Sequence, residues 1–315
     1  MYNSIDRNNP FDESVPALDM DLLRKLIGQQ PQCEPILEHS AILGCGYVGS
    51  ALADYWQDQG HFVTGTTTST ERVASLSEIV SQAVVIKGND LGGLQLLLQG
   101  QDTLVVSVAP TGFQEADRST YAATYITTAK NVATALSHNP SVKQVIYLSS
   151  CSVYGDRQGE WVDETAQIDP LDDKSQIIYE AEKIILQAAN ERQKVCVLRL
   201  GGIYGTGREL VNMFGGLAGM TMPGKGDRFI NWIHRDDIIS AIDFARLNEL
   251  NGIYNLVDDS QLTVKEQVKL VCARYGLPPV TWDISKLSPP RNSLQVSNHK
   301  LKAVGFELIH PQLFV

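Results

Sequence analysis

The chain has 315 residues, with 26 basic and 36 acidic side chains, a net charge of −10 and 43% apolar residues. This composition is typical of a folded globular protein and excludes a disordered one, because the apolar fraction is large and the net charge per residue is small. The basic residues are scattered through an acidic chain, which argues against nucleic acid or an anionic membrane as a partner.

Targeting segments and metal sites are also disfavoured. The N-terminus carries acids before any apolar run, unlike a signal or transit peptide. The longest uncharged window, residues 210–224, is too short to span a bilayer and is broken by glycines and Pro223. Five widely spaced cysteines form no Cys-x-x-Cys or Cys/His cluster, so neither a disulfide framework nor a metal site is expected. These features predict a protein of the reducing cytoplasm.

Residues 1–35 are mostly polar and are interpreted as an N-terminal extension. Within them, Leu22, Leu23, Leu26 and Ile27 fall at helical spacing and predict one short amphipathic helix. Two interpretations remain open, a helix packed on the body of the protein and a helix that binds a partner.

From residue 40 onward, short apolar runs alternate with longer helical patterns. The predicted strands cover residues 41–43, 62–64, 84–86, 103–108, 142–148 and 195–198. The predicted helices between them cover residues 50–59, 71–81, 91–99, 119–137 and 176–191. Nearly continuous apolar strands that alternate with helices indicate a parallel sheet covered on both faces. The predicted fold is therefore α/β, a doubly wound Rossmann-type parallel sheet.

The strict alternation ends after Gly205, where a helix, a strand and a helix are predicted at residues 236–247, 253–257 and 264–275. We expect these segments to form a small C-terminal substrate lobe over the carboxyl edge of the sheet, where open α/β sheets bind ligands. The predicted division is an extension over residues 1–35, a Rossmann domain over residues 36–205 and a lobe over most of residues 206–315.

A G-x-G-x-x-G run, Gly44-Cys-Gly46-Tyr-Val-Gly49, lies directly between the first strand and the first helix. This is the context that a dinucleotide-binding fingerprint requires. Gly44 permits the tight turn, Gly46 lets the backbone approach a pyrophosphate, and Gly49 allows close helix packing. The helix start, at Tyr47 and Val48, offers free N–H groups to the phosphates. The alternative is a plain strand-to-helix turn.

The end of the second strand bears on the choice between NAD and NADP. An NAD site usually places an acid there to bind the adenosine ribose. This chain instead has a Thr/Ser stretch from Thr66, followed by Glu71 and Arg72. Hydroxyl groups and an arginine can hold a 2′-phosphate, so the sequence favours NADP over NAD, with Thr66 and Arg72 as contacts. A simple polar loop is the alternative.

Tyr179 and Lys183 place a phenol and an ammonium four residues apart on one face of a helix. The ammonium favours the phenolate form, so Tyr179 could exchange a proton with a substrate hydroxyl or carbonyl. Such a pair also arises by chance on exposed helices. This one follows the strand that leads into the hydroxyl-rich residues 149–152, which are expected at the carboxyl end of the sheet.

The ordered motifs together resemble the extended short-chain dehydrogenase/reductase superfamily, in its NAD-dependent epimerase/dehydratase group and near its atypical branch. The resemblance covers about residues 40–311. The motifs that carry it are the glycine loop, the run from Ser149 to Gly155, Tyr179 with Lys183, residues 199–205, residues 232–238, and Arg291 followed by residues 297–301.

The resemblance implies roles for individual residues. Tyr179 would be the acid/base, Lys183 would bind the nicotinamide ribose, and Ser150 would hydrogen-bond the reacting oxygen. Further cofactor contacts would be Asp90 at the adenine, Ala109 and Pro110 along the cofactor, and Ile203, in the loop of residues 202–204, near the carboxamide. Asn131 resembles a helix residue that orders the active site. His234, beside Asp236 and Asp237, would join the lobe to the sheet rather than bind a metal or act as a base.

Three departures from the family pattern limit the prediction. Leu43 replaces the first glycine of the usual loop, as in atypical members, some of which have lost the tyrosine and lysine. Cys151 and Ser152 stand where sugar-nucleotide dehydratases carry Asp-Glu, which disfavours a 4,6-dehydratase. The lobe lacks a clear nucleotide-diphosphate cluster. Four arginines could hold an anionic group or be ordinary surface residues, namely Arg208, Arg228, Arg235 and Arg291.

The predicted function is that of an NAD(P)-dependent oxidoreductase or epimerase, which transfers hydride to or from a carbonyl or secondary alcohol. A sugar or sugar-nucleotide is one substrate class, and an anionic small molecule is compatible with the arginines. The alternative is a non-catalytic NAD(P)-binding scaffold, redox sensor or assembly factor. The family often dimerises through helices that correspond to residues 119–137 and 176–191, so a homodimer is a further expectation.

Overall fold

The computed structural model describes residues 38–110, 116–288 and 291–313. The chain divides into a unit of residues 1–36 and a unit of residues 37–315, and the second unit is described here. The predicted N-terminal extension and its amphipathic helix lie outside the described residues. In the part of the chain that is described, no helix is long and apolar enough to cross a membrane.

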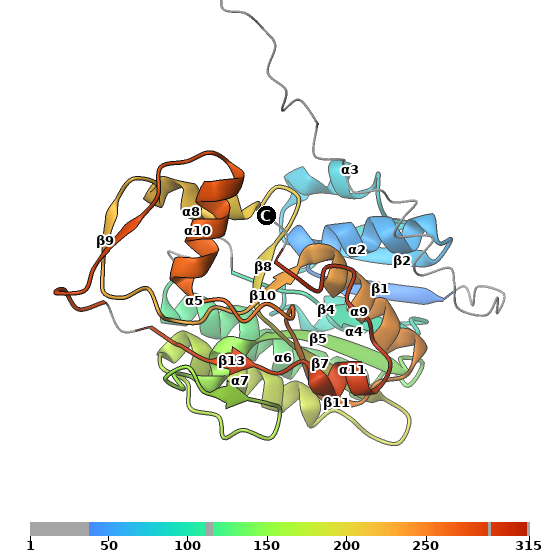
Figure 1. The fold of residues 1–315 in the computed structure, drawn as a ribbon. Coiled ribbons are helices and arrows are strands. Elements are labelled where there is room, and N and C mark those ends of the chain that lie inside the picture. The colour runs from blue at the N-terminus through green and yellow to red at the C-terminus, as the bar shows by residue number, and fades with distance from the viewer. Residues whose placement is uncertain (1–37, 111–115, 289–290, 314–315) are drawn as a thin grey trace, which may run out of the picture. The chain divides into compact units, whose positions relative to one another are not determined.

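A seven-stranded parallel sheet forms the centre of this unit, in the order β11-β7-β5-β4-β1-β2-β3 (Figure 1). The strands are β1 (His39–Leu43), β2 (Phe62–Thr67), β3 (Gln82–Val85), β4 (Thr103–Val106), β5 (Gln144–Ser150), β7 (Lys194–Leu200) and β11 (Gly252–Leu256). The chain builds outward from β1 to β3, and then from β4 to β11 on the other side. The order therefore reverses between β1 and β4, which is where open α/β sheets form a ligand crevice.

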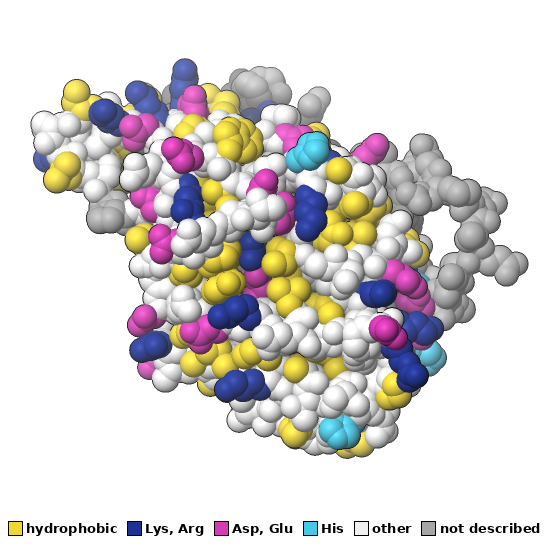
Figure 2. Space-filling view, turned by 90° about the horizontal axis from the view of Figure 1, so that it is seen from below, with side chains coloured by type: hydrophobic (Ala, Val, Ile, Leu, Met, Phe, Trp, Pro, Cys, Tyr) yellow, Lys and Arg dark blue, Asp and Glu magenta, His cyan; other side chains and the backbone are white. Residues whose placement is uncertain are grey.

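Helices cover both faces of the sheet. The main ones are α2 (Tyr47–Asp58), α4 (Leu91–Leu97), α6 (Thr128–Ser137), α7 (Asp173–Leu186) and α9 (Arg235–Leu247). Helices α2 and α9 pack on each other above the sheet in Figure 1, whereas α6 packs on both α4 and α7, with α6 and α7 below the sheet. This arrangement confirms the predicted doubly wound Rossmann-type fold. On the face of the molecule seen in Figure 2, acidic and basic side chains are interspersed, so charge of one sign does not accumulate there.

Short elements after residue 200 form the lobe. They are β8 (Gly202–Tyr204), α8 (Leu210–Phe214), β9 (Thr221–Pro223), β10 (Trp232–His234), α10 (Val264–Arg274) and β12 (Thr281–Asp283). Strand β8 pairs with β10, and β9 with β12. A separate apolar core of Tyr204, Leu210, Phe214, Trp232 and Val271 holds the lobe together. Its aromatic rings meet edge to face, an arrangement that rings favour.

Two elements that we assigned to the lobe belong to the sheet. Helix α9 packs on α2 and β5, and β11 is the edge strand, paired with β7 from Gly252 opposite Cys196 to Leu256 opposite Leu200. The segments predicted at residues 236–247 and 253–257 therefore lie with the sheet, and the division after residue 205, with most of residues 206–315 in the lobe, stays a prediction. Their apolar pattern is that of any buried helix and strand, so it could not distinguish the two locations. The predicted helix over residues 119–137 is also interrupted, by a π-helical turn at Ala123–Thr127 between α5 (Arg118–Ala122) and α6.

A buried ion pair fixes α7 against the sheet. The Glu182 carboxylate, with no exposed surface, accepts hydrogen bonds from Arg199 Nε at 3.1 Å and Arg199 Nη2 at 2.5 Å. It also accepts one from Ser149 Oγ at 2.8 Å. Arg199 in β7 lies 4.8 Å from the ring centre of Tyr154, whose hydroxyl donates to Asn255 in β11 at 2.7 Å. One network thus joins α7 to three strands of the sheet.

We expect Glu182→Ala to lower the free energy of unfolding by about 3–5 kcal/mol, because it leaves the Arg199 guanidinium buried and unpaired. Urea denaturation measures the change. The control is Glu180→Ala on the same helix, where Glu180 is only half-buried and accepts a hydrogen bond from Gln176. That variant should stay within about 0.5 kcal/mol of the wild type. Equal losses in the two variants would contradict the special role of the buried pair.

Candidate active site at the carboxyl edge of the sheet

The glycine loop follows β1 at the reversal point of the sheet. Gly44 has a φ of +100°, and a Cβ there would lie 2.6 Å from the carbonyl oxygen of Ser107. A Cβ on Gly49 would lie 2.3 Å from the carbonyl oxygen of Gly44. Both contacts are too short for real atoms, so the protein's own packing requires glycine at these two positions.

Gly46 is different, because a Cβ added there meets nothing within 4 Å. Gly46 caps α2, and no side chain bonds to the first N–H groups of this helix, which begins at Tyr47. The Val48 side chain is buried, so only its backbone could face a ligand. Uncapped N–H groups beside open space fit the phosphates of a dinucleotide.

Thr66 and Arg72 both hold the loop from the β2 side. Thr66 Oγ1 accepts a hydrogen bond from Gly44 N at 2.9 Å, and Thr66 is buried. Its hydroxyl therefore braces the glycine loop. Arg72 ends the short helix Thr70–Arg72, is exposed, and donates from Nη2 to the Cys45 carbonyl at 2.8 Å. Its guanidinium is therefore placed at the loop, and within the described residues only one of its donors has a hydrogen-bond partner.

Glu71 introduces a negative charge beside Arg72. Its carboxylate accepts a hydrogen bond from the Ser69 hydroxyl, which holds the pKa of Glu71 below its usual value. A charged carboxylate and a guanidinium thus stand side by side at the end of β2. The first suits ribose hydroxyls and the second suits a 2′-phosphate.

Three other predicted residues lie on loops along the same edge. Asp90 caps α4, with Oδ1 accepting from Gly93 N at 2.9 Å, and is otherwise exposed. Asn131 in α6 donates to the Gly88 carbonyl at 2.9 Å and so fixes the loop that carries Asp90. Ala109 is exposed and Pro110 buried, just beyond β4 and therefore next to the glycine loop.

The predicted proton-transfer residues come from β5 and α7. Ser150 ends β5, is half-buried, and accepts a hydrogen bond from Ser152 N at 3.1 Å. Lys183 Nζ lies 4.7 Å from the ring centre of Tyr179, so these two side chains meet as their spacing predicted. Tyr179 is half-buried and Lys183 is exposed.

The hydrogen bonds of Glu182 with Arg199 and Ser149 fix which face of α7 packs against the sheet. Glu182 lies against Ser149, the residue before Ser150, and α7 runs antiparallel to the strands because it connects parallel β5 and β7. Residues one and two turns before Glu182 on the same helix face are Ile178 and Ser175, and both are buried. Tyr179 and Lys183 therefore project from the flank of α7.

Ile203 lies in β8, where it pairs with Ile233 of β10 and is half-buried. Both flanking glycines are packed tightly. A Cβ on Gly202 would lie 2.7 Å from the Trp232 ring, and one on Gly205, which has a φ of +133°, would lie 2.9 Å from His234 Nε2. The loop predicted to contact the carboxamide is thus held by the lobe.

The comparison with known families agrees with this geometry. The NAD dependent epimerase/dehydratase family matches residues 41–256, which run from β1 to the end of β11. This chain belongs to that family. The match includes the glycine loop, Ser150, Tyr179 and the ion pair of Glu182 with Arg199.

The chain is also similar to a curated protein in sequence and to solved structures in fold. Protein YeeZ of Escherichia coli (strain K12) is 29% identical over 291 residues, which cover 87% of this chain and 97% of YeeZ. The UDP-glucose 4-epimerase of Thermotoga maritima, solved with UDP-glucose, has a TM-score of 0.70 at 19% identity, over 86% of this chain and 94% of the epimerase. MoeE5, solved with UDP-glucose and NAD, has a TM-score of 0.70 at 19% identity, over 86% of this chain and 93% of MoeE5.

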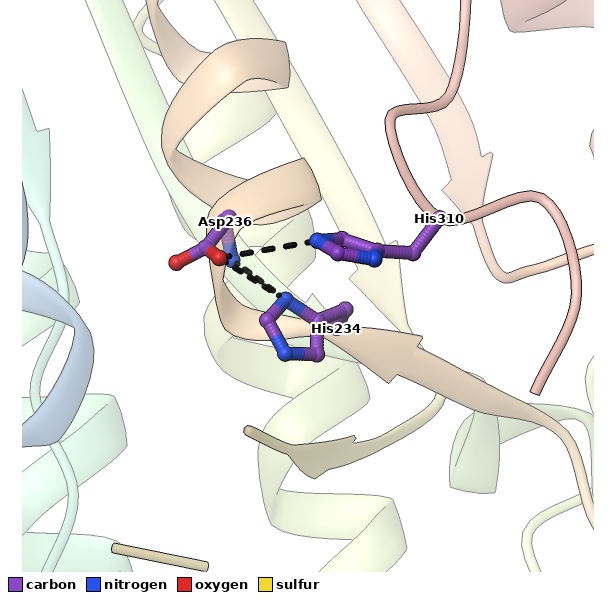
Figure 3. A group of neighbouring side chains, drawn as sticks. All are labelled: His234, Asp236 and His310. Carbon is purple, nitrogen blue, oxygen red and sulfur yellow. Dashed lines mark hydrogen bonds and ion pairs between the residues drawn. The ribbon is translucent and has the colours of Figure 1, made fainter. Parts of the chain in front are cut away.

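A cluster of side chains within this NAD dependent epimerase/dehydratase fold was only partly predicted (Figure 3). Asp236 Oδ2 lies 3.1 Å from His234 Nδ1 and 3.6 Å from His310 Nε2, and the two imidazole rings lie 4.0 Å apart. Burial alone would raise the pKa of Asp236, but the two neighbouring imidazoles and the nearby Arg235 guanidinium hold it well below its usual value. Asp237 accepts hydrogen bonds from the backbone N–H groups of Ile309 and His310.

This cluster fastens the segment around His310 to the start of α9. The three side chains Asp236, His234 and His310 present atoms close enough together to hold a metal ion. However, His234 Nδ1 also accepts the Asp236 N–H at 3.2 Å and so caps α9, which uses its lone pair. We therefore interpret the cluster as a latch that supports Gly205. Sequence reasoning identified His234 and Asp236, but nothing near His310 indicated its part.

Gly46→Ala separates ligand binding from folding, because the added methyl group meets no protein atom but occupies the space open to a phosphate. We expect its thermal unfolding midpoint to match the wild type and its affinity for NADH or NADPH to fall at least tenfold, measured by nicotinamide fluorescence. Gly49→Ala is the matched variant, and its methyl group should destabilise the fold itself. Undiminished cofactor binding by Gly46→Ala would place the dinucleotide elsewhere.

Proposed function

We propose that this chain is an NAD(P)-dependent oxidoreductase or epimerase that transfers hydride to or from a carbonyl or secondary alcohol. The observation that carries the proposal is the glycine loop, where Gly46 faces open space beside the uncapped start of α2. Ser150 and Tyr179 stand on β5 and α7, which belong to the same sheet and its covering helices. The nicotinamide would supply the hydride chemistry when bound.

In this proposal the chain's own residues handle the proton and the reacting oxygen. The Tyr179 phenol exchanges a proton with the substrate oxygen, and the Ser150 hydroxyl hydrogen-bonds that oxygen. Lys183, whose ammonium lies 4.7 Å from the Tyr179 ring centre, binds the nicotinamide ribose beside the phenol. Ile203, Ala109 and Pro110 line the cofactor.

The proposed substrate is a sugar or sugar-nucleotide with an anionic group. Arg228 and Arg291 support this class, because burial and the nearby positive charge of Arg291 lower the pKa of Arg228. Within the described ranges, neither guanidinium forms an ion pair within 4.0 Å. Arg228 Nη1 donates only to the Asn292 carbonyl, at 3.2 Å. Two such neighbouring guanidinium groups suit a phosphate or carboxylate.

NADP is the proposed cofactor in preference to NAD. Arg72 supports it, because the guanidinium is exposed and is held at the Cys45 carbonyl, beside the loop. Glu71 opposes it, because its charged carboxylate would repel a 2′-phosphate. The preference for NADP over NAD then depends on which of these two side chains lies closer to the 2′ position of the bound adenosine.

A second candidate function is a non-catalytic NAD(P)-binding scaffold or sensor. The rotation of α7 favours it, because Ile178 and Ser175 occupy the buried face above Glu182 while Lys183 is exposed. A homodimer remains a proposal as well. Between α6 and α7 lies a shallow hollow lined by Ala133, Ile184 and Ala188, among others, on the helices proposed to meet a second copy.

Tyr179→Phe distinguishes the two candidate functions. For the enzyme, we expect turnover of a sugar-nucleotide such as UDP-glucose, followed by nicotinamide absorbance, to fall roughly 10²- to 10⁴-fold with cofactor affinity unchanged within about twofold. The control is Tyr275→Phe, an exposed tyrosine of the lobe, which should retain full turnover. Full activity of Tyr179→Phe would remove this phenol from the mechanism. A wild type that binds cofactor but turns over none of a panel of sugar-nucleotides would favour the scaffold.

Arg72→Ala tests cofactor choice. Loss of a charge-assisted contact with the 2′-phosphate should weaken NADPH about tenfold and leave NADH nearly unchanged, in paired fluorescence titrations. Glu71→Ala is the matched opposite, and removal of its charge should tighten NADPH relative to NADH. The assignment of Arg72 fails if the ratio of the two dissociation constants is the same in wild type and Arg72→Ala.

A further inference from the structure

Tyr47, the first residue of α2, joins the glycine loop to the lobe. Its hydroxyl donates to the Thr206 carbonyl at 3.0 Å, across 159 positions of sequence. The guanidinium of Arg208 lies 4.2 Å from the centre of the Tyr47 ring, and that of Arg235 lies 5.1 Å from it. Two cations from the lobe side therefore stand at the residue that opens the predicted phosphate-binding helix.

The two guanidinium groups differ in how their charge is balanced. Arg235 Nε lies 3.8 Å from Asp236 Oδ1, and Arg235 Nη1 lies 3.5 Å from the Thr206 carbonyl. Arg208 is exposed and, among the residues that the structure describes, takes part in no ion pair within 4.0 Å.

The acid next to Arg208 does not neutralise it. Glu209 accepts a hydrogen bond from Gly207 N at 2.8 Å and from Asn212 Nδ2 at 2.8 Å. The bond from Gly207 lowers the pKa of Glu209, and both bonds direct its carboxylate to its own loop. In a chain of net charge −10, an unpaired guanidinium stacked on the glycine loop is an uncompensated local positive charge.

We propose that Arg208 is a clamp for the diphosphate of the bound dinucleotide. The N–H groups at the start of α2 would hold the diphosphate from the sheet side, and the Arg208 guanidinium, stacked on Tyr47, would bind it from the lobe side. Arginine suits this task, because its planar guanidinium can stack on a ring and still donate two parallel hydrogen bonds to phosphate. The clamp rests on the proposed function and adds a residue that closes the lobe onto the cofactor.

The clamp also explains why the loop after β8 is tied to Tyr47 rather than to the sheet. Thr206, held by Tyr47 and Arg235, and Gly205, packed against His234, fix the segment that leads to Arg208. A diphosphate bound by Arg208 would therefore fasten the entrance of the lobe. Ligand binding in the lobe and cofactor binding at the loop would then be coupled through this residue.

The test is competition of ADP and of adenosine against NADH, measured on the full chain by nicotinamide fluorescence. Arg208→Ala should weaken ADP and NADH by the same factor, about tenfold or more, and leave adenosine unchanged. Arg208→Lys keeps the charge but not the bidentate geometry. Its affinities for ADP and NADH should lie between those of the wild type and those of Arg208→Ala. Arg274→Ala, an exposed arginine at the end of α10, is the matched control and should bind all three ligands like the wild type.

Each other outcome counts against the clamp in a recognisable way. Unchanged ADP and NADH affinity in Arg208→Ala overturns it while the proposed cofactor site stands. Equal weakening of ADP, NADH and adenosine, or a lowered unfolding midpoint, assigns Arg208 a structural role and also overturns it. A folded wild type that binds neither NADH nor ADP overturns the proposed function and the clamp together.

Discussion

The structure at the carboxyl edge depends on one buried ion pair, Glu182 with Arg199. Neither charge reaches solvent, so each is tolerated only while its partner is in place. Because Glu182 sits on α7 and Arg199 on β7, the pair fixes the height and the rotation of the helix against the sheet. It also draws in Ser149, which precedes the predicted catalytic serine, and Tyr154, which stacks on the guanidinium. The positions of Ser150 and Tyr179 are consequences of this contact.

This constraint shows what could be read from the sequence and what could not. Parallel strands buried on both faces are nearly continuous apolar runs, so β1, β5 and β7 were predictable from the pattern of apolar residues along the chain. The glycine loop was predictable because the spacing of its glycines matches the positions at which a dinucleotide-binding turn requires residues without a side chain. The rotation of α7 was not, because an acid in a helix of mixed charge gives no sign that it is fully buried. His310 was not either, because its partners lie more than seventy positions earlier in the chain.

The location of β11 could not be predicted from the sequence for a related reason. A short apolar strand has the same pattern at the edge of the main sheet as in a small lobe, and only pairing with β7 distinguishes them. The lobe is consequently built from two segments of the chain, one between β7 and α9 that contains β8 and β10, and one after β11 that contains α10 and β12. Strands β8 and β10 lie side by side and meet the body of the protein near Gly205, His234 and Tyr47. Movement of the lobe would therefore directly displace residues of the glycine loop.

The three glycines of that loop differ in whether the protein's own atoms exclude a side chain at their position. Gly44 and Gly49 are required by atoms of the protein itself, because a Cβ at either position would collide with a backbone carbonyl oxygen. A Cβ on Gly46 would meet no other atom within 4 Å, so packing of the described residues does not require the absence of a side chain there. A lineage that abandoned the cofactor would be free to fill this position without losing its fold. On the proposed binding mode, the residue at the second glycine of a relative would therefore indicate whether that relative still binds the dinucleotide.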